Sequence, residues 1–430
     1  MHVFLKTVGL VFLCHFLFAQ NPQIIRGPYL QSVSPTSGIV CWRTDLPTTS
    51  QVVYGDNLSA QKQKVNHPEL VTEHRVTIQK LSPNKKYYYS IGDGKTMSTP
   101  SEARYIKTVP ALGSKEQVRI WALGDFGSGS LNQKAVLKSI VNFTEKKRPD
   151  AWIWLGDNAY NNGKDEEYQK NVFDVYQQAF LQNLPIYPSP GNHDYGGKHD
   201  PSLPPYFKIF NMPSEGQAGG VASHSESYYS VNYGPVHLIA LDTEMREPSG
   251  LQLFDGKGLQ VEWLKADLAA NKLPWVVVYF HKPPYSKGSH DSDVELDMKS
   301  LREHVNPIFE QYKVDLVIAG HSHVYERSYP MRGHYGINET FDAASHVVAQ
   351  GSSKNHYTVG PKGQGVIYVV SGSGGKFGGQ RPGYPMKSSI YTNNTIGGSV
   401  LLDVTKRTFS LKWIQSDGVV GDQFVIEKSE

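Results

Sequence analysis

The stretch Val314-Asp315-Leu316-Val317-Ile318-Ala319-Gly320-His321-Ser322-His323 indicates both the fold class and a metal site. Residues 316–319 are all apolar, which is typical of a short strand buried on both faces of a sheet. Gly320 permits a tight turn directly after this strand. His321 and His323 then lie at the carboxyl end of a strand, where open α/β sheets bind their ligands. On a regular strand these two side chains would diverge, but from a turn they can reach two neighbouring ions.

Four other apolar runs also end in Asp, Asn or His. The five blocks are Gly124-Asp125-Phe126-Gly127 after residues 118–123, Gly156-Asp157-Asn158-Ala159-Tyr160 after 151–155, Gly191-Asn192-His193-Asp194 after 185–188, His281 after 275–280, and Gly320-His321-Ser322-His323 after 316–319. One Gly-Asp after a strand is usually only a turn, and one His-x-His is a weak sign of a metal. Five such ends in one region favour a shared site over five unrelated turns.

The polar residues at these ends form a set of metal ligands if the ends converge. They comprise two carboxylates, a phenol, an amide and three imidazoles: Asp125, Asp157, Tyr160, Asn192, His281, His321 and His323. The set is too large for one ion and suits two ions that share a carboxylate. Two ions a few ångström apart form a clamp for in-line attack on phosphorus.

The rest of the chain predicts two domains. Residues 21–112 carry strand-length runs separated by Pro and Gly, and residues 81–89 resemble the turn and tyrosine of fibronectin type III-like sandwiches, so we expect a β-sandwich there. From residue 115 to 430, strands alternate with helical periodicity at 131–147, 166–182, 258–272 and 300–313. We therefore expect a layered α+β or α/β domain with two packed mixed sheets flanked by helices. The strands after residue 398 are expected to complete the second sheet.

Composition excludes some classes of protein. The 430 residues carry a formal net charge of +3, with 39% hydrophobic and 19% charged residues, so the chain is an ordinary globular protein and not a strongly basic nucleic-acid binder. Residues 1–20 are typical of a secretory signal peptide, because the apolar run from Val8 to Ala19 is too short to cross a bilayer. We expect a secreted or periplasmic protein. Once this segment is removed, Cys41 is the remaining cysteine, so we expect a buried, unreactive thiol and no disulfide-linked dimer.

In this order, the five blocks resemble those of the purple acid phosphatases, the tyrosine-bearing branch of the metallophosphoesterases. The tyrosine of the second block is the specific feature. The resemblance extends to the front domain, where Arg26-Gly27-Pro28-Tyr29-Leu30 and Trp42-Arg43-Thr44 look like the start of the long, plant-type members. It implies that one ion is held by Asp125, Asp157, Tyr160 and His323, and the second by Asp157, Asn192, His281 and His321.

The two ligand sets differ in chemistry. The first set is mostly anionic oxygen, which suits Fe³⁺, and a Fe³⁺–phenolate would give the purple colour that the resemblance implies. The second set holds two imidazoles and a neutral amide, which suit a divalent ion such as Zn²⁺, Fe²⁺ or Mn²⁺.

Two further histidines are candidate catalytic residues. His193, next to Asn192, could bind a phosphate oxygen or protonate the leaving alkoxide. His290 lies nine residues beyond His281, the spacing at which the family places a substrate-contacting histidine. Long plant-type members often carry a second histidine where this chain has Asp291, so the preference for leaving group or pH could differ here, and the role of Asp291 stays open.

The resemblance implies a secreted acid phosphatase that hydrolyses small-molecule phosphomonoesters through attack of a metal-bound hydroxide. A phosphodiesterase, nucleotidase or phytase with the same centre is the nearest alternative, decided by loops at 196–227 and 331–398. A secreted binding module with a degenerate metal site is an alternative from another class. Serine hydrolysis lacks support, because the sequence shows no Gly-x-Ser-x-Gly elbow with a fitting order of His and Asp.

Overall fold

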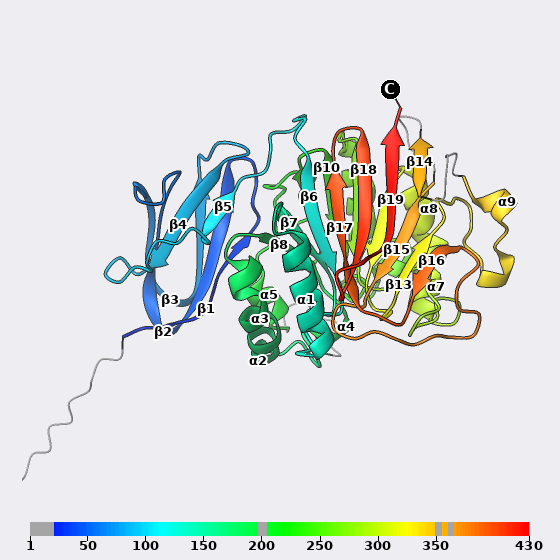
Figure 1. Cartoon of the computed structure of the whole chain (residues 1–430), viewed down its shortest axis with the longest axis horizontal. Coiled ribbons are helices and arrows are strands. Elements are labelled where there is room, and N and C mark those ends of the chain that lie inside the picture. Colours follow the sequence, from blue (N-terminus) through cyan, green and yellow to red (C-terminus); the bar gives the residue numbers. More distant parts are fainter. Residues whose placement is uncertain (1–20, 197–203, 349–354, 360–364, 430) are drawn as a thin grey trace, which may run out of the picture.

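The computed structural model describes residues 21–196, 204–348, 355–359 and 365–429. The expected signal peptide at residues 1–20 lies outside this part of the chain. The described residues form two β-sheets that pack against each other, with helices on their outer faces (Figure 1). The expected architecture, a β-sandwich followed by a domain of two packed mixed sheets flanked by helices, is confirmed. No helix among the described residues has the length and apolar character that crossing a membrane requires.

The larger sheet runs through both halves of the molecule, in the order β14-β19-β18-β17-β6-β7-β8-β1-β2-β4-β5, with β3 beside β2. Its strands are β1 (Ile24–Gln31), β2 (Ser37–Gly55), β3 (Gln63–Gln79), β4 (Lys86–Gly92), β5 (Tyr105–Lys107), β6 (Val118–Leu123), β7 (Ala151–Leu155), β8 (Pro185–Ser189), β14 (His356–Val359), β17 (Gly398–Val404), β18 (Thr408–Gln415) and β19 (Val420–Lys428). β6, β7 and β8 are parallel.

The C-terminal strands belong to this larger sheet. β17 pairs antiparallel with β6, and β18 and β19 follow it outward. The expectation that these strands complete the second sheet is therefore wrong. Apolar alternation predicts a strand but not its partner, and here β17 covers the edge of β6, which would otherwise expose unpaired backbone groups.

The smaller sheet has the order β16-β13-β15-β12-β11-β10-β9. Its strands are β9 (Tyr229–Tyr233), β10 (Val236–Ala240), β11 (Trp275–Phe280), β12 (Leu316–Ala319), β13 (Tyr325–Ser328), β15 (Ile367–Ser371) and β16 (Ser389–Asn393). On β11, Trp275, Val277 and Tyr279 pack into the core between the sheets, whereas Val276, Val278 and Phe280 pack with the outer helices. Both faces are buried, which is why this strand is an unbroken apolar run in the sequence.

The helices and helical turns are α1 (Leu131–Phe143), α2 (Asp165–Tyr168), η1 (Gln169–Phe173), α3 (Asp174–Tyr176), η2 (Gln177–Leu181), α4 (Asn192–Tyr195), α5 (Tyr206–Ile209), η3 (Leu253–Asp255), α6 (Leu259–Ala270), α7 (Leu296–His304), α8 (Asn306–Gln311), η4 (Asn338–Thr340) and α9 (Ala343–His346). The helix expected at 166–182 is a continuous helical stretch in which η1 and η2 are π-helical turns. The single helix expected at 300–313 is wrong. It begins earlier and divides into α7 and α8, because Pro307 has no N–H to continue the ladder of α7.

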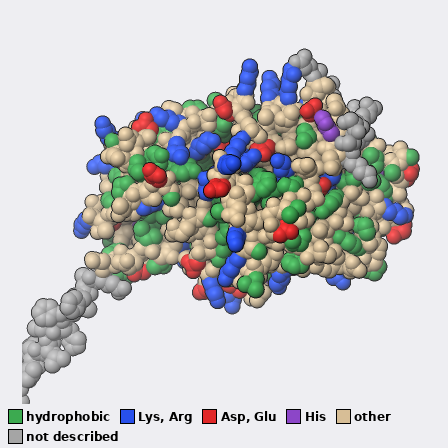
Figure 2. All heavy atoms as spheres, viewed as in Figure 1, with side chains coloured by type: hydrophobic (Ala, Val, Ile, Leu, Met, Phe, Trp, Pro, Cys, Tyr) green, Lys and Arg blue, Asp and Glu red, His purple; other side chains and the backbone are tan. Residues whose placement is uncertain are grey.

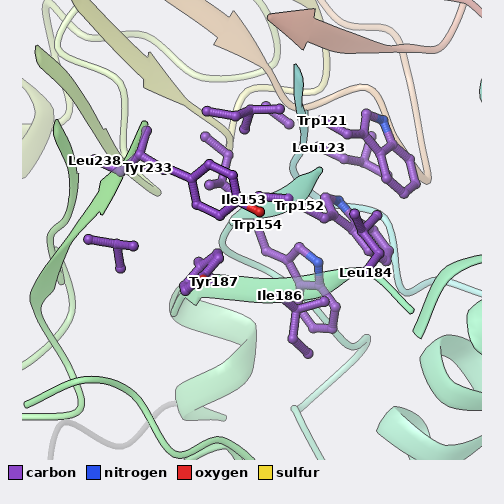
Figure 3. Packing of buried hydrophobic residues seen from close by; sticks show 14 of the residues in the cluster. Trp121, Leu123, Trp152, Ile153, Trp154, Leu184, Ile186, Tyr187, Tyr233 and Leu238 are labelled. Atoms are coloured by element: carbon purple, nitrogen blue, oxygen red, sulfur yellow. The ribbon is translucent and has the colours of Figure 1, made fainter. Parts of the chain in front are cut away.

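A cluster of aromatic side chains holds the strands that lead to the candidate site (Figure 3). Trp121 of β6 stacks on Trp152 of β7 with ring centroids 4.1 Å apart, and Trp154 lies 4.9 Å from Trp152. All three rings are fully buried. Aromatic pairs of this kind contribute about 0.5–1.5 kcal/mol each beyond the area that they bury, so they help to hold β6 and β7 together.

The front sandwich is joined directly to the second half of the chain. β1 pairs in parallel with β8, through Leu30 opposite Pro185. Arg26 and Arg43, from the two stretches that resemble plant-type members, both bind the Asp165 carboxylate of α2. The Tyr87 hydroxyl accepts the Ser82 N–H at 2.9 Å, the contact expected of a sandwich tyrosine.

Cys41 is buried on β2, as its apolar neighbours in the sequence predict. The Cys41 thiol is free and buried, and burial raises its pKa to about 12. On the face shown in Figure 2, Lys and Arg side chains are interspersed with Asp and Glu.

Candidate metal centre

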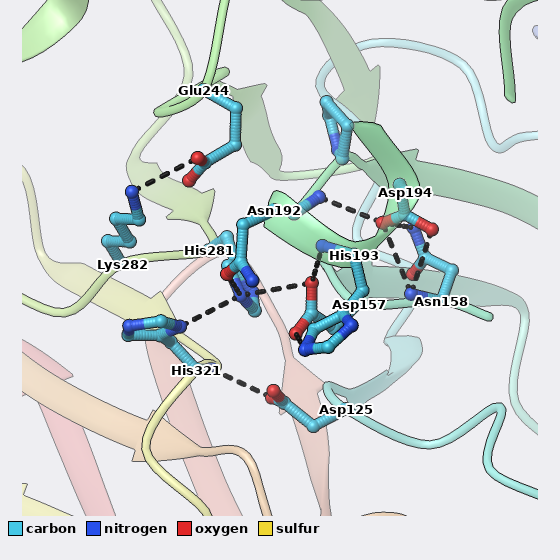
Figure 4. Close-up of polar contacts among 12 residues, drawn as sticks. Asp125, Asp157, Asn158, Asn192, His193, Asp194, Glu244, His281, Lys282 and His321 are labelled. Atoms are coloured by element: carbon cyan, nitrogen blue, oxygen red, sulfur yellow. Dashed lines mark hydrogen bonds and ion pairs between the residues drawn. The ribbon is translucent and has the colours of Figure 1, made fainter. Parts of the chain in front are cut away.

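The five sequence blocks meet at one place, but they come from two sheets. Asp125, Asp157 and Asn192 follow β6, β7 and β8 of the larger sheet, whereas His281 and His321 follow β11 and β12 of the smaller sheet. The His321 N–H donates to Asp125 Oδ2 at 2.8 Å, which ties the two sheets together at this point (Figure 4). The site therefore lies where the carboxyl ends of both parallel sets face each other.

Tight turns after the strands direct these side chains inward. Asp125, Asp157 and His321 adopt the left-handed conformation, with φ of 57°, 50° and 66°. Non-glycine residues seldom adopt this conformation, and where they do they are often found at functional sites. Gly320 allows close approach, because a Cβ there would lie 2.5 Å from Asp125 Oδ2.

One group of donor atoms surrounds the phenol of Tyr160. Its hydroxyl donates to Asp125 Oδ1 at 3.0 Å and to Asp157 Oδ2 at 3.1 Å. His323 Nε2 lies 3.5 Å from the same hydroxyl and 3.6 Å from Asp125 Oδ1. Three oxygens and one imidazole nitrogen thus point at one small volume.

A second group of donor atoms surrounds His281 Nε2. This nitrogen lies 3.1 Å from Asn192 Oδ1, 3.1 Å from His321 Nδ1 and 3.3 Å from Asp157 Oδ1. His281 Nδ1 lies 2.9 Å from the Leu155 carbonyl, which can only accept, so Nδ1 carries a proton and Nε2 is the ring nitrogen that faces the group. Asp157 takes part in both groups, one oxygen in each.

The pKa values of the buried residues indicate that both donor groups favour additional positive charge. Burial, with the neighbouring Asp157 charge, raises the pKa of Asp125 well above its usual value. Burial alone would also raise the pKa of Asp157, but the charge and hydrogen bond of His281 lower it. Burial lowers the pKa of His281, yet Asp157 more than offsets this and raises it to about 10. Protons thus supply the positive charge that these buried carboxylates need, and bound cations would supply it in the same place. The donor set therefore fits a pair of metal ions.

The two candidate catalytic histidines border the groups and are partly exposed. The backbone N–H of His193 donates to Asp157 Oδ1 at 2.8 Å. The centroid of the His193 ring lies 4.5 Å from that of the Tyr160 ring. The His290 ring stacks on His321 with centroids 3.7 Å apart. The His193 and His290 side chains are 36% and 31% exposed, so a substrate at the groups can reach both.

Asp291 pairs with a lysine of its own loop. Its carboxylate lies 2.8 Å from Lys287 Nζ and is mostly buried. Because Asp291 forms an ion pair within its own loop, it does not play the part of the second histidine that long plant-type members often carry at this position.

Three polar residues at the site carried no assigned role in the sequence. Asp194 accepts the Gly191 N–H at 2.8 Å and the Asn158 N–H at 3.1 Å, which ties the second block to the third. Glu295 lies 3.0 Å from His290 Nδ1 and 3.8 Å from His321 Nε2. Lys376 lies over the Tyr160 ring, with Nζ 5.5 Å from its centroid. Asp194 stands inside a quoted block, but Glu295 and Lys376 belong to no motif, and only the fold brings them here.

Comparison with known proteins agrees with this geometry. Residues 118–325 match the family model of calcineurin-like phosphoesterases, and residues 26–108 match the model of the purple acid phosphatase N-terminal domain. Human acid phosphatase type 7 is 28% identical over 368 residues, covering 79% of this chain and 75% of the human protein. Purple acid phosphatase from Glycine max is 24% identical over 405 residues, covering 89% and 80%. The structure of a purple acid phosphatase from yellow lupin (Lupinus luteus) seeds superposes with a TM-score of 0.72 at 21% identity, covering 94% of this chain and 74% of the lupin chain.

Proposed function

The chain belongs to the purple acid phosphatases and is a metal-dependent hydrolase of phosphoesters, and on this basis we propose that it is an acid phosphatase acting on phosphomonoesters. The proposal assigns two neighbouring cations to the two donor groups. Asp125, Asp157, Tyr160 and His323 would hold the first, and Asp157, Asn192, His281 and His321 the second. The observation that carries the proposal is Asp157, whose two oxygens face different donor groups 3.1 Å and 3.3 Å away.

The type of ligand in each group supports a particular choice of metal. Three anionic oxygens, including a phenolate, suit Fe³⁺ at the first position, and two imidazoles with an amide oxygen suit Zn²⁺, Fe²⁺ or Mn²⁺ at the second. When bound, the two cations supply Lewis-acid polarisation of the phosphoryl oxygens and of the attacking water.

The histidines at the border supply proton transfer and anchoring. His193 Nδ1 contacts the Asn161 carbonyl, which fixes the ring and leaves Nε2 facing the groups. In its protonated form, His193 can donate from Nε2 to the departing alkoxide oxygen. His290 Nδ1 contacts the Glu295 carboxylate, so its Nε2 is free to bind a phosphoryl oxygen.

The test is the variant Asp157→Asn, assayed on an aryl phosphate together with elemental analysis. The amide keeps the shape but cannot bridge two cations, so we expect loss of at least one ion per chain and a fall in kcat of about a thousandfold or more. Asp315→Asn is the matched control, because Asp315 is also buried but pairs with Lys428 away from the centre. Full activity of Asp157→Asn with both ions bound would disprove the shared carboxylate.

We also propose that the protein is exported, with residues 1–20 as the leader. The support is the sequence of that segment, whose apolar run from Val8 to Ala19 is typical of a secretory leader. Expression with and without residues 1–20, followed by fractionation, tests this. Equal distribution of the two forms between cells and medium or periplasm would contradict it.

A further inference from the structure

A lysine with no assigned role overhangs the candidate metal centre. Lys376 lies on the loop between β15 and β16, and its Nζ is 5.5 Å from the centroid of the Tyr160 ring. His193, in α4, contacts the same ring. Lys376 is exposed, so its ammonium group faces both the centre and the solvent from which a substrate arrives.

Backbone hydrogen bonds fix the position of the loop that carries this lysine. The Gly375 N–H donates to the Asp125 carbonyl at 2.8 Å, and the Gly378 N–H donates to the His323 carbonyl at 2.9 Å. Further along, the Arg381 N–H donates to the Lys287 carbonyl at 2.8 Å. The backbone at Lys376 is thus held on both sides by residues that are bonded to ligand-bearing blocks, which keeps the lysine side chain within reach of Tyr160.

The charge of Lys376 is available to a ligand. Among the described residues, no carboxylate lies within ion-pair distance of its ammonium group. The carboxylates beneath it, Asp125 and Asp157, contact Tyr160 and the histidines of the two donor groups. A cation placed at the entrance of a site that handles phosphate attracts additional negative charge on the substrate.

We propose that Lys376 raises the enzyme's efficiency on substrates whose leaving side carries a second phosphoryl group, such as pyrophosphate and nucleoside diphosphates, relative to its efficiency on phosphomonoesters of uncharged alcohols. This inference rests on the proposed function. In the reaction the water oxygen forms the new P–O bond and releases one of its protons to the solvent, and the P–O bond to the bridging oxygen breaks. The departing phosphate keeps that electron pair and so gains negative charge, which the Lys376 ammonium stabilises. A neutral alcohol offers this lysine no second anionic group.

The experiment compares wild type with Lys376→Gln and Lys376→Arg on pyrophosphate and on phenyl phosphate. For Lys376→Gln we expect kcat/KM for pyrophosphate to fall about tenfold, the range of a charge-assisted hydrogen bond at a partly exposed site, and to fall clearly less for phenyl phosphate. Lys376→Arg keeps the charge and should retain most of the preference. Lys86→Gln is the matched control, since Lys86 is exposed and lies 4.1 Å from the Tyr105 ring in the front sandwich.

A binding measurement separates this inference from the proposed function. Calorimetry with methylenediphosphonate and methylphosphonate, which resist hydrolysis, should show that Lys376→Gln weakens binding of the first compound more than of the second. Equal losses on both compounds, or no loss on either, would overturn the role of Lys376. Failure of the wild type to hydrolyse either substrate with its metals bound would instead refute the proposed function, and the calorimetry would still decide on Lys376.

Discussion

Replacing Gly156 by alanine tests how closely His281 of the second donor group is packed against the backbone after β7. Gly156 follows β7 with φ of 86°, and a Cβ there would lie 2.5 Å from His281 Nδ1. Ordinary contact distances are about 3.5–4.0 Å, so the His281 ring must move by about 1 Å or more. That movement would break the bond of Nδ1 to the Leu155 carbonyl, which orients Nε2.

The expected loss of stability has three contributions: the strained backbone conformation, the overpacking and the lost hydrogen bond. An L-residue in the left-handed conformation costs about 1–2 kcal/mol. Overpacking adds about 1–3 kcal/mol, and the lost His281–Leu155 hydrogen bond adds about 1 kcal/mol. We therefore expect Gly156→Ala to lower the free energy of unfolding by about 3–6 kcal/mol. Gly250→Ala is the matched control, because Gly250 has the same φ of 86° but no atom within 4 Å of the added Cβ.

The assay is urea denaturation of both variants after metal removal with a chelator, and elemental analysis before removal. Gly250→Ala should lose only about 1–2 kcal/mol and keep its metals. Gly156→Ala should lose more and bind the second ion weakly. Equal destabilisation of the two variants, with equal metal content, would refute the reasoning about His281.

Two further predictions concern groups away from the ligands, and one concerns a support of the site. Burial raises the pKa of Glu326 from 4.5 to about 7, so the folded state binds this proton more tightly than the unfolded state, and the Glu326 contribution to the free energy of unfolding falls by about 3 kcal/mol as pH rises from 4.5 to 7. Urea denaturation at both pH values should show a smaller fall for Glu326→Gln, and an unchanged fall would contradict this. The Cys41 thiol, buried and with its pKa raised to about 12, should resist alkylation in the native state and react after unfolding, as mass spectrometry can show; rapid native labelling would count against its burial. Asp194→Ala should lower stability by about 3–5 kcal/mol in thermal and urea unfolding, because the Gly191 and Asn158 N–H groups lose their buried acceptor, whereas Asp194→Asn should cost clearly less; similar costs for both would argue against the role of these bonds.

Much of the candidate site could be predicted from the sequence, because each block is recognisable from a short local pattern of residues. An apolar run that stops at Gly-Asp or Gly-His places a polar side chain at a strand end without knowledge of the fold. The structure brings all nine of the named site residues, the seven candidate ligands with His193 and His290, to one place. The sequence could not show that three blocks follow strands of one sheet and two follow strands of the other, since an apolar run does not reveal which strands it pairs with.

The remaining differences have physical causes of two kinds. The break between α7 and α8 was visible in the sequence as Pro307, but the apolar period of residues 300–313 continued across it and masked the boundary. Glu295 and Lys376 are different, because each reaches the site only through loops packed together by the tertiary fold. The same holds for the pairing of β17 with β6. Local pattern predicts elements, whereas long-range packing decides their neighbours.

The central claim is that strand ends from two sheets gather side chains around a pair of cations, one of them bound to Tyr160. The most direct measurement is elemental analysis with a visible absorption spectrum of the purified wild type and of Tyr160→Phe. The account predicts two ions per chain with iron among them, a visible band in the wild type, and loss of that band in Tyr160→Phe. A wild type without tightly bound metal, or a band that persists in Tyr160→Phe, would contradict it.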